Sequence, residues 1–116
     1  MNNLSNSVRL TGRLGAAPVM KQIDEEKKVA KINLATHYYR KNGKGEMVQE
    51  THWHQLVLWN RHAEIAEKHL NKGSQIAIEG RLANRFYTDK DGVKHQVTEI
   101  VVSELMLLGK PVAVQS

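Results

Sequence analysis

The sequence contains no cysteine, and several classes of protein are excluded for that reason. Without thiols there is no disulfide framework, no thiolate metal site and no cysteine nucleophile. No window approaches the roughly 18 apolar residues that a membrane-spanning helix requires. The N-terminus has no basic patch followed by an apolar run, so no signal peptide is expected. These absences favour a soluble protein of the cytoplasm that does not bind membranes.

Motifs of catalysis are also missing. His52 and His54 have the H-x-H spacing that can chelate a metal on one face of a strand. No third ligand at suitable spacing and no HExxH motif accompanies them. The sequence has neither a G-x-S-x-G motif nor a G-x-x-x-x-G-K-[ST] loop, so nucleophilic catalysis and ATP use are not expected. We therefore predict no enzyme, no metal and no cofactor.

The charge balance is basic. Seventeen Lys and Arg face twelve Asp and Glu, which gives a formal net charge of +5. A small basic domain attracts polyanions over long distances. A modest excess of this size is also compatible with a solvated surface that only aids solubility. Charge alone therefore leaves nucleic-acid binding open.

Strands dominate the predicted secondary structure. Residue patterning favours strands at 7–15, 27–36, 51–60, 74–88 and 93–109. Residues 38–47 are expected to form a basic loop with a tight turn at Asn42-Gly43, and 89–92 a hairpin turn. With one helix between the third and fourth strands, the order is that of a mainly β, five-stranded Greek-key barrel of the OB type. One domain is expected over 1–110, followed by a short extension, 111–116.

The single helix is predicted over 61–72. Ala63, Ala66 and Leu70 recur at helical spacing. Asn60 is a favourable N-cap residue, and Gly73 fits the C′ position that ends a helix.

The two tryptophans lie in one strand. Because side chains alternate along a strand, Trp53, Gln55 and Trp59 share one face, and Leu56 and Leu58 share the other. The leucine face is the predicted core. A dry core disfavours an amide between two rings, so the tryptophans are expected on the outside of the barrel.

The other aromatic residues also accompany cations. Tyr38 and Tyr39 begin the basic segment, and Phe86 and Tyr87 follow Arg85. Exposed rings interleaved with cations are typical of surfaces that bind single-stranded nucleic acid, because bases stack on the rings and cations neutralise phosphates. The alternative is an interaction module whose rings are buried against another protein.

Nearly the whole chain resembles the DNA-binding domain of the bacterial single-stranded DNA-binding proteins. The similar runs are VRLTGRLG, INLAT, THWHQLVLW, AEIAEKHLNKGSQIAIEGRL, YTDKDG and VTEIVVSELMLLG. The resemblance implies a barrel that assembles as a homotetramer and wraps single-stranded DNA with little sequence preference, in replication, recombination and repair. It further implies a cytoplasmic protein associated with the nucleoid.

The resemblance also suggests roles for individual residues. The family's stacking rings fall on Trp53, Trp59, Tyr87 and Tyr39, although Tyr38 and Tyr39 are not distinguished; Phe86 is a further candidate. The candidate phosphate contacts are Arg9, Arg13, Lys21, Arg40, Lys41, Arg61, Lys72 and Arg85. His54 is expected at a subunit contact, together with the first strand and the sheet formed by 7–15, 74–88 and 93–109.

The sequence departs from the family pattern after its last predicted strand. Family members usually continue into a flexible linker and an acidic tip that recruits replication and repair proteins, whereas this chain ends in GKPVAVQS. Three explanations fit: a truncated form, a tail-less member, or a relative of primosomal replication protein N, a tail-less dimeric OB protein that acts in replication restart. Recruitment of partners through a tail is not predicted for this chain.

Overall fold

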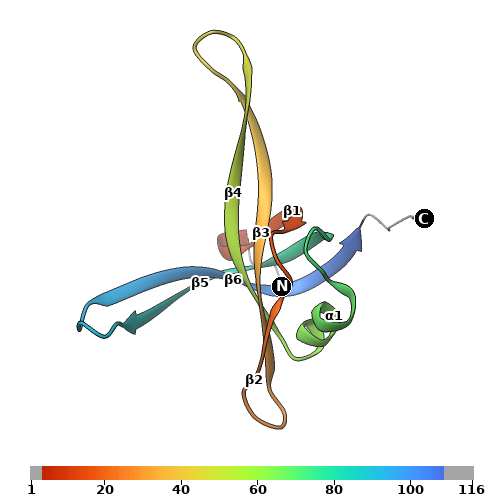
Figure 1. Cartoon of the computed structure of the whole chain (residues 1–116), viewed down its shortest axis with the longest axis vertical. Helices are drawn as coiled ribbons and strands as arrows, with labels where there is room; N and C mark the ends of the chain where they lie inside the picture. Colours follow the sequence, from red (N-terminus) through yellow and green to blue (C-terminus); the bar gives the residue numbers. More distant parts are fainter. Residues whose placement is uncertain (1–3, 109–116) are drawn as a thin grey trace.

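A computed structural model describes residues 4–108, which form a closed five-stranded barrel (Figure 1). The elements are η1 (Leu4–Asn6), β1 (Val8–Leu14), β2 (Val19–Gln22), β3 (Lys28–Lys41), β4 (Met47–Trp59), α1 (Arg61–His69), β5 (Gln75–Thr88) and β6 (Lys94–Leu108). Neighbouring strands follow the order β1-β5-β6-β4-β3, and a β1–β3 pairing closes the ring. The predicted OB-type barrel is confirmed. The extension predicted at 111–116 lies outside the described residues.

Two long hairpins project from the barrel in different directions (Figure 1). The β3–β4 ribbon is paired from Val29–Trp59 to Lys41–Met47, and the β5–β6 ribbon from Gln75–Leu108 to Thr88–Lys94. The strands are longer than barrel closure requires, so each ribbon presents two solvent-facing sides near its tip. Strand β2 is paired with β3 at the end opposite the β3–β4 tip.

Aliphatic side chains fill the barrel. Leu34, Leu56, Leu58 and Ile76 are fully buried, and each contributes about 1.5–3 kcal/mol through burial. The helix covers one end of this core with Ala63 and Ala66, and Leu70, directly after the helix, also enters the core. The barrel core therefore contains no aromatic side chain among the described residues, and the aromatic residues lie on the surface.

Closure of the barrel depends on one close approach. A Cβ atom at Gly12 would collide with the carbonyl oxygen of Ala35. Gly12 immediately precedes Arg13, which is paired with Ala35 where β1 meets β3. A side chain at position 12 would therefore push apart the two strands that close the ring.

The segment 38–47 was predicted as a loop, and this prediction is wrong. Strand β3 continues to Lys41 and β4 begins at Met47. The turn is longer than the expected Asn42-Gly43 pair, because the Asn42 N–H donates to the Glu46 carbonyl (2.9 Å) and the positive φ, 79°, is at Gly45. These strand ends bury little surface, so they lack the apolar alternation that marks a strand in the sequence.

Strand β2 was not predicted. It has four residues, of which only Met20 is partly buried, and its polar sequence gives no strand signal by itself. Pairing with β3 over Lys28–Lys31 supplies the backbone hydrogen bonds that make it a strand.

The helix begins at Arg61 as predicted, but the expected roles of Asn60 and Gly73 and the end at residue 72 need correction. Asn60 precedes the helix, but its φ is +51° and its side chain makes no capping bond; its Oδ1 accepts from the backbone N–H of Lys28 at 3.1 Å. The helix ends at His69 because Leu70, 3% exposed, turns into the core with an extended backbone. Gly73 is not the C′ residue. It has a φ of +88° in the following turn, and its N–H donates to the Leu14 carbonyl at 2.8 Å.

Candidate nucleic-acid interface

Three exposed aromatic residues share one face of the β3–β4 ribbon. Trp59 is paired with Val29 and Trp53 with Ala35, and Tyr39 lies four residues beyond Ala35 on β3. Paired residues, and residues an even number apart, point to the same side of a sheet. At about 3.4 Å per residue, Trp53 is separated from Trp59 by about 20 Å and from Tyr39 by about 14 Å. Trp53, Trp59 and Tyr39 are 60%, 42% and 58% exposed. We call this surface the tryptophan face.

Cations lie on the same face as these rings, two of them in the same rows as the tryptophans. Lys21 of β2 is paired with Val29 and therefore lies in the row of Trp59. Arg13 of β1 is paired with Ala35, in the row of Trp53. The predicted Lys41 ends the same face at the ribbon tip. Four strands, β1 to β4, thus bring rings and cations together on one surface.

Lys31 also belongs to the tryptophan face and was missed in the sequence. It is exposed and paired with Val57, between the two tryptophans. The sequence did contain a signal for Lys31. It directly precedes the core residue Ile32, so on a strand its side chain must point outward. Val57 itself is 6% exposed despite facing the same side; it is also paired with Val101 of β6.

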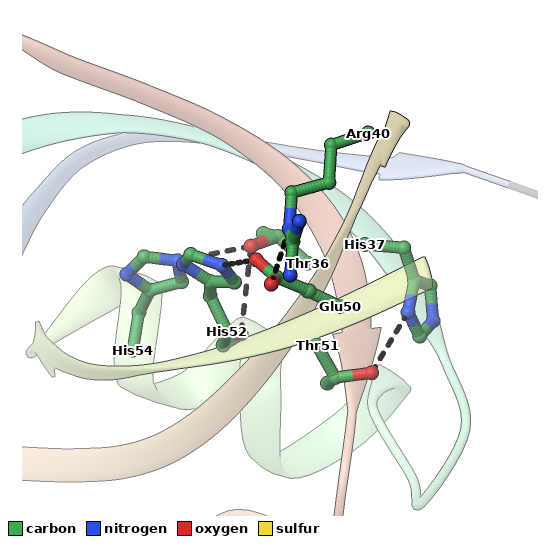
Figure 2. A network of polar contacts seen from close by, with 7 residues as sticks. All are labelled: Thr36, His37, Arg40, Glu50, Thr51, His52 and His54. Carbon is green, nitrogen blue, oxygen red and sulfur yellow. Dashed lines mark hydrogen bonds and ion pairs between the residues drawn. The ribbon is translucent and has the colours of Figure 1, made fainter. Parts of the chain in front are cut away.

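Tyr38 and Arg40 lie on the opposite side of the ribbon, and Figure 2 shows Arg40 beside Glu50. The Arg40 Nε donates to Glu50 Oε2 at 2.7 Å, and Glu50 Oε1 is 3.5 Å from His52 Nε2. The bond from Arg40, and a weaker one from His52, hold the pKa of Glu50 below its ordinary value. The rings of Tyr38 and His52 meet edge to face at 6.0 Å. The predicted Arg40 is therefore already neutralised by a carboxylate.

His54 lies at the base of that same side, next to the core. Its Nε2 is 3.0 Å from Thr36 Oγ1, and the ring is half-buried. Burial, with a smaller effect of the nearby His52, lowers the pKa of His54. Figure 2 shows His54 and His52 together, with His37 and Thr51 on the other side of the strands. Between residues 4 and 108, no three His, Cys, Asp or Glu side chains are grouped so that they could hold a metal ion.

The second ribbon carries the remaining predicted rings, and it separates them. Tyr87 is paired with His95, whereas Phe86 is paired with Gln96 and points to the other side. Arg85 shares the side of Tyr87 and binds Glu99 with two nitrogens, at 3.0 and 3.4 Å. This carboxylate, which is 7% exposed, raises the pKa of Arg85.

A groove of about 440 Å³ lies where the two ribbons part. The lining residues come from both: Trp53, His54 and Gln55 of β4, Leu82 of β5, and Gln96, Val97, Thr98 and Ile100 of β6. The groove therefore connects the tryptophan face with the second ribbon.

Three further predicted cations, Arg61, Lys72 and Arg9, lie outside the two ribbons. Arg61 is exposed at the start of α1, two residues after Trp59. Arg13 Nη1 donates to the Gly73 carbonyl at 3.1 Å, which brings the turn carrying Lys72 next to β1. Arg9 lies further along β1, and its Nε is 3.5 Å from Glu79 Oε1.

No helix within residues 4–108 combines the length and apolar character needed to cross a membrane.

The chain is similar to known proteins over almost all of its described length. The model of the single-strand binding protein family matches residues 5–108. The single-stranded DNA-binding proteins of Xanthomonas campestris pv. campestris and Xanthomonas axonopodis pv. citri are each 38% identical over 104 residues, which is 90% of this chain. The chain spans about 60% of the length of these relatives.

Two solved structures have the same fold. The Plasmodium falciparum SSB in complex with ssDNA has a TM-score of 0.81 and 31% identity, and the match covers 94% of this chain and all of that one. A deletion mutant of the single-stranded DNA binding protein from Thermus aquaticus has a TM-score of 0.78 and 30% identity, with 90% and 50% covered. From its barrel, its exposed ring-and-cation surface and these matches, the chain belongs to the single-strand binding protein family.

Proposed function

We propose that this chain binds single-stranded DNA without strong sequence preference, and that it does so through the tryptophan face. The observation that carries the proposal is the exposed row of Trp59, Trp53 and Tyr39 with Lys21, Lys31 and Arg13 on the same surface. Stacking on such rings contributes about 1–3 kcal/mol per base and accepts every base. The two Xanthomonas relatives are named for this activity, and the Plasmodium falciparum structure holds single-stranded DNA.

The role is binding, not catalysis. By covering strands exposed in replication, recombination and repair, the protein would protect them and prevent hairpins and re-annealing. The second ribbon would extend the DNA path, through Tyr87 and the groove between the ribbons.

Assembly as a homotetramer belongs to the same proposal. Strands β1, β5 and β6 form one continuous sheet, whose outer surface includes the exposed Thr11 and Met106 on either side of the half-buried Ala77. His54 would lie at a further subunit contact.

The proposal is tested by titrating tryptophan fluorescence with oligo(dT) at low and high salt, with duplex DNA as the control. Strong quenching by oligo(dT), weakened by salt and nearly absent with duplex, is the expected result. For single strands, the logarithm of affinity should fall by about 0.7 per phosphate contact for each tenfold rise in salt. Unchanged fluorescence at low salt would contradict the proposal and favour a protein-interaction module.

A further inference from the structure

Tyr87 does not stand alone on the second ribbon, because its ring is stacked on His95. The two residues are directly paired across β5 and β6, with ring centroids 5.0 Å apart and an angle of 18° between planes. This stack covers one face of the tyrosine. A base that approaches here therefore finds two stacked rings. One of them is the imidazole of His95, whose side chain is 41% exposed.

Asp89 in the adjoining turn holds the imidazole in place. Its Oδ1 accepts the backbone N–H groups of Asp91 and Val93, both at 2.9 Å, and its Oδ2 lies 2.7 Å from His95 Nε2. The bond from His95, followed by that from Val93, lowers the pKa of Asp89, so the carboxyl stays ionised. An ionised carboxylate only accepts hydrogen bonds, so Nε2 carries the hydrogen and Nδ1 is the nitrogen that can take up a proton.

The charged groups around this ring are few. Arg85 lies 6.0 Å from the centre of the Tyr87 ring, and its charge is paired with Glu99. The turn also carries Lys90 and Asp91, whose side chains are exposed. Asp89 is the carboxylate in direct contact with the imidazole, so protonation of His95 completes an ion pair and leaves a new N–H donor at Nδ1.

We propose that Tyr87 and His95 form a single stacking platform and that uptake of a proton by His95 makes this platform hold single-stranded DNA more tightly as the pH falls. The proposal rests on the single-stranded DNA binding proposed above. The protonated ring still offers a flat face to a base. Its charge cancels that of Asp89, which otherwise repels phosphate, and the N–H at Nδ1 is a new donor for phosphate. One further phosphate contact steepens the salt dependence by about 0.7 in the log–log slope.

The test is a fluorescence-polarisation titration of labelled oligo(dT) at pH 8 and pH 5.5, over several salt concentrations. Thymine does not titrate in this range. His95→Phe keeps a flat ring but cannot be protonated, and His62→Phe makes the same change at a histidine of α1. Wild type and His62→Phe should gain affinity at pH 5.5 by roughly two- to fivefold more than His95→Phe, the range that an exposed charge pair supplies.

An equal gain in wild type and His95→Phe overturns this inference while leaving the proposed function intact. Failure of wild type to bind oligo(dT) at either pH refutes the proposed function itself. His95→Arg keeps the positive charge at both pH values, so it should show the smaller pH gain of His95→Phe, with tighter binding at pH 8. If circular dichroism shows that His95→Phe is unfolded, the pH gain of His95→Arg is compared with that of wild type instead.

Discussion

The indole ring of Trp53 lies against the backbone of Gly15. A Cβ atom at position 15 would stand 2.5 Å from Cζ3 and 2.7 Å from Cη2 of that ring. The ring therefore uses space that the missing side chain leaves open, just beyond the end of β1. Although Trp53 is 60% exposed, Gly15 fixes where it lies on the tryptophan face.

Gly15→Ala should displace the Trp53 ring, because the added methyl group takes its position. We expect a changed tryptophan emission spectrum and weaker binding of oligo(dT), with little loss of stability, because the exposed ring can move aside. Gly43→Ala is the matched control, since a Cβ atom there meets nothing within 4 Å. Equal oligo(dT) affinities for the two variants would contradict the positioning role of Gly15.

Tyr38 and Tyr39 are neighbours in the chain, but we expect their substitution to affect DNA affinity differently. Tyr39→Ala should weaken binding by about 1–3 kcal/mol, the cost of losing one stacked base, as should Trp53→Ala. Tyr38→Ala should change affinity little, because Tyr38 points away from the tryptophan face, toward His52. Affinity from polarisation titrations, with thermal melts to establish folding, decides between them. A larger loss for Tyr38→Ala would place the DNA on the other side of the ribbon.

Lys31 and Arg40 should differ in their response to salt. Lys31→Ala removes a cation between the two tryptophans, so the log–log salt slope should become shallower by about 0.7. Arg40→Ala removes a cation that Glu50 already neutralises on the far side of the ribbon, and the slope should stay near the wild-type value. Measuring affinity at four or more salt concentrations tests both. A shallower slope for Arg40→Ala alone would reverse the assignment.

Burial of His54 predicts how stability depends on pH. Its pKa is lower in the folded protein than the value of about 6.5 in an unfolded chain. Below that pH the unfolded chain takes up a proton that the folded protein resists, so the free energy of unfolding falls as pH drops from 8 toward 5.5. In His54→Gln this fall should be smaller. Urea unfolding at a fixed protein concentration measures it, and an unchanged pH dependence would show that His54 titrates alike in both states.

Residue alternation along the chain was enough to predict the barrel and to tell its inside from its outside. Alternation of aliphatic with polar residues predicted the five main strands, and Leu56 and Leu58 were placed in the core with Trp53 and Trp59 outside. This worked because burial of one strand face imposes a period of two that local sequence must obey. On β3 and β4 the signal ends where burial ends, so the outer part of that ribbon was missed, as was β2.

The contacts between side chains of different strands follow from the folded arrangement. Cross-strand register separated Tyr39 from Tyr38, added Lys31 to the tryptophan face, and paired Arg40 with Glu50 and Arg85 with Glu99. The stack of Tyr87 on His95 has the same origin. Such contacts join residues of different strands, and register and twist, which fix them, leave no periodic trace in the sequence of either strand.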